Sequence, residues 1–88
     1  MKIEASKQYR REIRKIIDAQ LVSPEYIEVM YCLQNRLPLP AKYKDHPLSG
    51  DWQGFRDCHI KNDLLLIYRI SGDILELARL NTHAEIFG

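Results

Sequence analysis

Two prolines in the motif Leu37-Pro38-Leu39-Pro40 divide this chain into halves with different hydrophobic periods. Each proline lacks a backbone N–H and biases the preceding residue to an extended conformation, so no helix continues through this segment. Before the motif, apolar residues recur with the period of about 3.6 that is typical of a helix. After Trp52, apolar and polar residues alternate as they do along a β-strand. The pattern therefore predicts helices first and strands second, which indicates an α+β fold.

The first half predicts a short strand and two helices. Residues 3–5 fit a strand, Ser6 is a candidate N-cap, and a helix follows from Lys7 to about Gln20. Its apolar stripe is Tyr9, Ile13, Ile16 and Ile17. Ser23 and Pro24 mark the start of a second helix that runs to about Asn35. In that helix we expect Val22 to pack on Ile27, and Ile27, Met30, Tyr31 and Leu33 to be buried.

The second half predicts an antiparallel meander of three strands, over residues 55–60, 64–70 and 74–80. Tight turns are expected at Lys61-Asn62 and Ser71-Gly72-Asp73, and a polar loop over residues 41–51. The strand over 64–70 is strongly apolar, so we expect it to be central and covered on both faces. The predicted architecture is a helical hairpin packed on a small, mainly antiparallel sheet.

The composition limits the classes of protein that fit. With 88 residues and 45% hydrophobic content, we expect one domain over residues 1–88 with a small core. No apolar run approaches the roughly 20 residues of a membrane span, and the N-terminus shows no secretory signal. We therefore expect a cytoplasmic protein without membrane partners. Cys32 and Cys58 are isolated from each other, which indicates small core residues and not a disulfide framework or a zinc knuckle.

The charge is unevenly distributed, although the formal net charge is only +1. Basic residues are concentrated within residues 7–15 of the first predicted helix, at Lys7, Arg10, Arg11, Arg14 and Lys15. Such a face can hold a phosphate backbone. It can equally be an ordinary solvated helix face.

Polar residues of the second half can meet at one edge of the sheet. In a meander the ends of the first and third strands and the start of the second lie together, which brings His59, Asp63 and Arg79 close to His83. The loop that carries His46 needs only to fold over that edge. Histidines supply a base and an acid, and arginine supplies a cation for developing phosphate charge, so cleavage of RNA is the leading hypothesis.

Each of these residues also has a purely structural interpretation. His46 precedes a proline and can cap a turn, His59 can be a half-buried imidazole, and Asp63 can be a turn residue. Arg79 can pair with Glu76 or Glu85 on the surface, and Phe87 can be a core anchor. Three histidines and an aspartate are competent zinc ligands, but no pair has the spacing typical of a metal site.

A longer set of motifs connects the chain to a known family. These are Leu37-Pro38-Leu39-Pro40-Ala41, Tyr43-Lys44-Asp45-His46-Pro47-Leu48, Gly50, Trp52, Gly54, Phe55-Arg56-Asp57, His59, Asp63, Leu66-Ile67-Tyr68, Arg79, Thr82-His83-Ala84 and Phe87-Gly88. In them the chain resembles the YafQ branch of the RelE/ParE toxin superfamily, closely over residues 37–88 and by pattern alone in the helical part.

The resemblance implies a RelE-like α+β fold and a function. Members are toxins of bacterial toxin–antitoxin pairs that enter the ribosomal A site and cut messenger RNA, and a cognate antitoxin masks them. The implied activity is a metal-independent endoribonuclease without cofactors, which works by attack of the ribose 2′-OH. A gyrase-inhibiting toxin of the ParE type and a catalytically silent binding module are the alternatives with the same fold.

Motif position also implies the site residues. The catalytic group would be His46, His59, Asp63, Arg79, His83 and Phe87. His83 would be the principal proton-transfer residue, Arg79 would stabilise the phosphorane, and Phe87 would hold a base or the backbone. Contacts to RNA or the ribosome are expected from Lys7, Arg10, Arg11, Arg14, Lys15, Lys44, Arg56 and Lys61. Leu64 stands where the family often has an aromatic residue, which leaves codon preference open.

Overall fold

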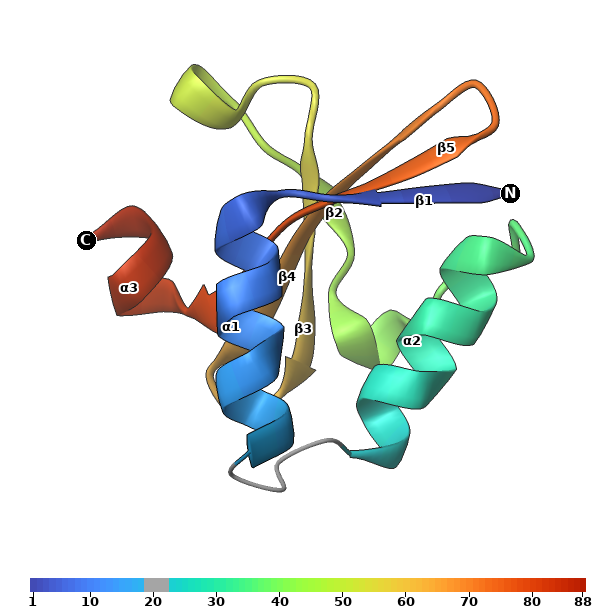
Figure 1. The fold of residues 1–88 in the computed structure, drawn as a ribbon. Helices are drawn as coiled ribbons and strands as arrows, with labels where there is room; N and C mark the ends of the chain where they lie inside the picture. Colours follow the sequence, from blue (N-terminus) through green and yellow to red (C-terminus); the bar gives the residue numbers. More distant parts are fainter. Residues whose placement is uncertain (19–22) are drawn as a thin grey trace.

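The centre of the fold is a five-stranded sheet with the strand order β1-β5-β4-β3-β2 (Figure 1). The computed structural model describes residues 1–18 and 23–88. The strands are β1 (Lys2–Ala5), β2 (His46–Pro47), β3 (Arg56–Lys61), β4 (Leu64–Ser71) and β5 (Ile74–Thr82). The helices are α1 (Lys7–Asp18), α2 (Pro24–Gln34) and α3 (His83–Phe87), with 3₁₀ turns η1 (Ala41–Tyr43) and η2 (Gly50–Trp52). Among these described strands only β1 and β5 pair in parallel, so the predicted mainly antiparallel α+β fold is confirmed.

The two long helices cover one face of the sheet (Figure 1). α1 packs against β5 and α2 against β3, and the two meet where the hydroxyls of Tyr9 and Tyr26 are hydrogen-bonded. Between helices and sheet lies the main core, formed by Tyr9, Val29, Leu33, Tyr43, Cys58, Ile60, Leu66, Tyr68, Leu75, Leu77 and Leu80. Burial of this apolar surface is the main force that holds the helices on the sheet.

Both predicted N-caps are confirmed. The Ser6 hydroxyl accepts a hydrogen bond from the Tyr9 N–H at 2.9 Å and donates one to the Ala78 carbonyl at 2.6 Å. The Ser23 hydroxyl accepts a hydrogen bond from the Tyr26 N–H at 3.2 Å. Each serine thus satisfies a donor that the first turn of a helix leaves free.

The buried face of α2 differs from the prediction. Ile27 and Tyr31 are 61% and 60% exposed, whereas Val29, Cys32 and Leu33 are buried. Apolar residues surround this helix, so its pattern does not fix which stripe faces the sheet. In α1, Ile17 is likewise exposed despite its place in the predicted stripe. The expected end of this helix at Gln20 and the expected packing of Val22 lie outside the described residues.

The strand predictions are confirmed, and β4 is the central strand. Leu66 and Tyr68 face the helices, while Leu65 and Ile67 point to the other face and are also fully buried. The segment predicted as a polar loop is more ordered than expected. It contains η1, η2 and the edge strand β2, which pairs with β3.

The C-terminal helix α3 was not predicted. Thr82 is its N-cap, and the Thr82 hydroxyl accepts a hydrogen bond from the Glu85 N–H at 3.2 Å. Threonine followed three residues later by glutamate is the signature of a capping box, so this signal was present in the sequence. In the part of the chain that the structure describes, no helix is long and apolar enough to cross a membrane.

Candidate active site

One row of directly opposed residues crosses four strands of the sheet. His46 on β2 faces Asp57 on β3, Asp57 faces Ile67 on β4, and Ile67 faces Arg79 on β5. Directly opposed residues of antiparallel strands project from the same face. The strand pairing therefore brings His46 and Arg79 to the face of the sheet that α1 and α2 leave uncovered.

The second histidine lies beside the first. His59 is two residues after Asp57 on β3, so it projects from the same face. The ring centroids of His46 and His59 are 6.3 Å apart, and the rings are tilted by 39°. His46 is exposed and His59 is partly buried, so a bound molecule can reach both imidazoles.

The position of the His46 ring is set by two oxygen atoms. Nδ1 lies 2.8 Å from the Lys44 carbonyl oxygen and 3.1 Å from Oδ1 of Asp57. Both oxygens are acceptors when Asp57 is ionised, so Nδ1 carries the hydrogen. In neutral His46 the other ring nitrogen, Nε2, is then the basic one.

Asp57 is the residue that sequence reasoning missed. Its side chain is buried, and Oδ1 has no hydrogen-bond partner within the described residues apart from the close approach of His46. Burial raises the pKa of Asp57, and the nearby His46, His59 and His83 lower it only in part. The available signal was its place two residues before His59, because residues two apart on a strand share a face.

His83 and Phe87 lie together on α3. Their ring centroids are 5.0 Å apart, and both side chains are exposed. Thr82 fixes the start of the helix, and His83 is its first residue. Phe87 is thus a surface aromatic and not a core anchor.

Asp63 shows no bond to the other predicted residues within the part of the chain that the structure describes. It is exposed in the turn between β3 and β4, after Asn62 with its φ of 54°. The turn thus sits one residue later than predicted. Among the described residues Asp63 forms no hydrogen bond or ion pair with the histidines or Arg79. Leu64 is partly buried against the main core, where it gives no aromatic surface to a ligand.

Arg79 pairs with an unexpected partner. Its Nε and Nη2 atoms donate to the carboxylate of Glu12 on α1, at distances from 2.8 to 3.2 Å. The alternative interpretation, a surface pair with Glu76 or Glu85, is therefore wrong: Arg79 pairs with Glu12, and Glu76 pairs with Arg69. Glu12 stands within the apolar stripe of α1, three residues after Tyr9, and an acid at that position was the signal for a buried partner.

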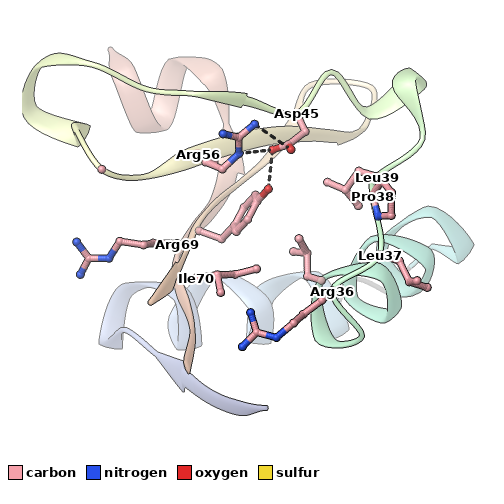
Figure 2. Close-up of a pocket in the computed structure, with 11 residues that line it drawn as sticks. Arg36, Leu37, Pro38, Leu39, Asp45, Arg56, Arg69 and Ile70 are labelled. Atoms are coloured by element: carbon pink, nitrogen blue, oxygen red, sulfur yellow. Dashed lines mark hydrogen bonds and ion pairs between the residues drawn. The ribbon is translucent and has the colours of Figure 1, made fainter. Parts of the chain in front are cut away.

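The basic residues fall into two groups. The basic side chains of α1 are exposed and accessible to RNA, and so is Lys44. Those on α1 are Lys7, Arg10, Arg11, Arg14 and Lys15. Arg56 instead donates to both carboxylate oxygens of Asp45, and Tyr68 donates to the same carboxylate at 2.6 Å (Figure 2). Lys61 lies 3.4 Å from a carboxylate oxygen of Glu25.

Both cysteines are buried and free, as predicted. Burial raises the pKa of the Cys58 thiol far above its ordinary value, so this sulfur stays protonated and is a poor nucleophile. Within residues 1–18 and 23–88, no group of three or more histidine, cysteine, aspartate or glutamate side chains is arranged to hold a metal ion.

Comparisons with known proteins agree over the whole chain. Residues 1–88 match the family model described as the bacterial toxin of type II toxin-antitoxin system, YafQ. The mRNA interferase toxin YafQ of Escherichia coli K12 is 41% identical over 90 residues, which cover 98% of this chain and 95% of that protein.

Solved structures give the same result. YafQ from E. coli BL21(DE3) has a TM-score of 0.88 at 38% identity, over 98% of this chain and 97% of that one. YafQ in the E. coli DinJ-YafQ toxin-antitoxin complex has a TM-score of 0.84 at 41% identity, over 98% and 96%. A copper-bound mutant toxin from Helicobacter pylori has a TM-score of 0.91 at 34% identity, over 99% of both chains. The chain belongs to the YafQ family of bacterial type II toxins.

Proposed function

We propose that this chain is a single-domain mRNA interferase over residues 1–88, which cuts messages in the ribosomal A site and so stops translation. One observation carries the proposal. The imidazoles of His46 and His59 lie beside the buried carboxylate of Asp57, and His83 is close enough to influence the same carboxylate. A cation, Arg79, stands in the same cross-strand row.

The base of the reaction is His46. With its Nδ1 hydrogen directed at the Lys44 carbonyl and Asp57, the free Nε2 accepts the proton of the ribose 2′-OH. The 2′-oxygen then attacks the adjacent phosphorus in line. Asp57 stabilises the imidazolium that forms, as a carboxylate does behind a catalytic histidine. DNA lacks the 2′-hydroxyl, so the reaction is specific for RNA.

The acid is His83, which protonates the departing 5′-oxygen. The products are a 2′,3′-cyclic phosphate and a free 5′-hydroxyl, and the reaction needs no metal. Arg79 stabilises the charge that develops on the phosphorane. Phe87 is 38% exposed beside His83 and can stack on a base of the message. His59 and Asp63 orient the substrate.

The partners follow from the same proposal. The exposed basic face of α1 contacts ribosomal RNA, where phosphate charge is dense. The ribosome supplies the message in a splayed geometry, so naked RNA is a poor substrate. A cognate antitoxin masks the toxin, as in the DinJ-YafQ complex of the E. coli relative. The place of action is the cytoplasm, where messages are translated.

The test is cleavage on ribosomes stalled on a defined message, with 5′ ends mapped by primer extension. We expect cuts within the A-site codon from the native chain. His83→Ala should cut ~10²–10⁴-fold more slowly, because it lacks the acid. Gln34→Ala, an exposed substitution on α2, is the matched control and should cut normally. A folded native chain that makes no cuts would contradict the proposal and favour gyrase inhibition or a silent binding module.

A further inference from the structure

Glu12 occupies the place of a missing strand at the edge of β5. β1 covers this edge only as far as Leu77, which is paired with Ala5. Ser6 then satisfies the next backbone groups of β5, through its N–H and its hydroxyl. Beyond them, the Glu12 carboxylate accepts the Leu80 N–H at 2.9 Å, where a further strand would have offered a carbonyl.

The same carboxylate fixes two side chains of β5. Arg79 donates to both of its oxygens, and Asn81 donates to Oε2 through Nδ2 at 2.9 Å. Burial would raise the pKa of Glu12, but the hydrogen bonds from Arg79, Leu80 and Asn81 outweigh it and lower the pKa. Glu12 is therefore a fixed negative charge against which the guanidinium of Arg79 is aligned.

We propose that Glu12 is a positioning residue for Arg79 in RNA cleavage. Glu12 takes the Nε and Nη2 side of the guanidinium, while Nη1 makes no hydrogen bond within the described residues. A guanidinium carries five N–H donors in a rigid plane, so fixing one edge fixes the direction of the others. Glu12 thus presents the Nη1 donors to the phosphate. This role rests on the proposed function, because it requires Arg79 to stabilise the phosphorane.

The chain contains a matched pair without this role. Arg69 and Glu76 form the same kind of bidentate pair between β4 and β5, with distances of 2.6 and 3.0 Å. Arg69 faces Glu76 near the turn that joins these strands. The residues that precede His83 lie at the opposite end of the pairing, where Leu64 faces Thr82. Comparing the two pairs distinguishes the general effect of losing a bidentate ion pair from the specific effect of losing the pair that orients Arg79.

The experiment is a double-mutant cycle on ribosome-bound message, with single-turnover rates at saturating toxin. Arg79→Ala should slow cleavage by about 10²–10³-fold, since one charge-stabilising group is lost. Glu12→Gln should slow it by roughly 10- to 100-fold, because the guanidinium is no longer held in one orientation. Ribosome affinity should not change. In the Arg79→Ala background, Glu12→Gln should have no further effect beyond about twofold.

The controls decide between positioning and a general structural role. Glu76→Gln should cut at the native rate. If Glu12→Gln slows cleavage as much in the Arg79→Ala background as alone, Glu12 acts through the fold and the proposal is overturned. If Glu12→Gln does not fold, Glu12→Asp in the same cycle keeps the charge and tests the position alone. If the native protein and Arg79→Ala cut equally well, the positioning role of Glu12 is excluded but the proposed function stands. If the native chain never cuts, the proposed function is excluded as well.

Discussion

Glu12 and Asp57 are buried to the same extent, each with 3% of its surface exposed, yet the protein treats the two carboxylates in opposite ways. Glu12 receives hydrogen bonds from a guanidinium, a backbone N–H and a side-chain amide. In Asp57, Oδ1 has no hydrogen bond within residues 1–18 and 23–88, and Nδ1 of His46 lies 3.1 Å from it. The pKa of Glu12 is lowered and that of Asp57 is raised.

The difference separates a buried carboxylate whose charge is compensated by hydrogen bonds from one whose charge is not. Buried polar groups are almost always hydrogen-bonded, so an exception at a candidate active site indicates a function that compensates for its cost. Glu12 joins α1 to the end of β5 and gains stability from each donor. Asp57 lacks such donors and is not stabilised in this way, but its charge lies next to the histidines.

The largest expected effect is on stability, from Glu12→Ala. This change leaves the partly buried guanidinium of Arg79 without its partner and the Leu80 N–H without an acceptor. Loss of one member of a buried pair costs about 3–5 kcal/mol of unfolding free energy. Urea denaturation followed by circular dichroism measures it. A loss comparable to that of Glu76→Ala, whose carboxylate is only partly buried, would show that the two carboxylates do not differ as described.

The next largest effect is expected from Asp57→Asn, which should raise stability and lower activity. We expect the unfolding free energy to rise by about 1 kcal/mol, because an incompletely hydrogen-bonded buried charge is removed. Cleavage on the ribosome should fall roughly 10- to 100-fold, since His46 loses the carboxylate that orients it. Denaturation and primer extension on the same preparation check both. A variant that is both less stable and less active would mean that the charge of Asp57 stabilises the fold, as the charge of Glu12 does.

The smallest effect is on the pH dependence of stability. The lowered pKa of Glu12 means that its contribution is present above the ordinary value of 4.5 and is lost as the pH falls through the folded-state pKa. The deficit of Glu12→Gln relative to the native chain should therefore shrink on acidification. Urea midpoints measured from about pH 7 to about pH 3 test this linkage.

Asp57 should show the opposite linkage. Its raised pKa means that ionisation costs stability at neutral pH, and protonation on acidification removes that cost. The gain from Asp57→Asn should therefore vanish as the pH falls. The groups that share this environment are His46, His59, His83 and Asp45, so the same titration in His46→Ala shows how much of the linkage belongs to the aspartate. Parallel curves for the Glu12 and Asp57 variants would contradict the comparison.

Local signals in the sequence predicted most of the fold. Ser6 and Ser23 could be identified as N-caps because capping depends on neighbouring residues alone. The apolar run in β4 placed it at the centre of the sheet for a similar reason, since only a strand covered on both faces can bury it. The buried face of α2 could not be predicted, because Ile27 and Tyr31 are as apolar as the residues that face the sheet.

The candidate site was less predictable because its key contacts join distant parts of the chain. The histidines could be selected by residue type and topology. The partner of Arg79 could not, since Glu12 lies 67 residues away on another element. Asp57 escaped notice because an aspartate in an alternating strand is normally a solvent-facing residue, and only the pairing of β2 with β3 places His46 over it.

The parallel pairing of β1 with β5 also dictates when the toxin can be complete. Lys2 is paired with Ile74, so β1 can join the sheet only after β5 has formed. Contacts so far apart in the chain form late, because a long loop must close first. Because β5 carries Arg79, we expect the proposed site to form late in folding.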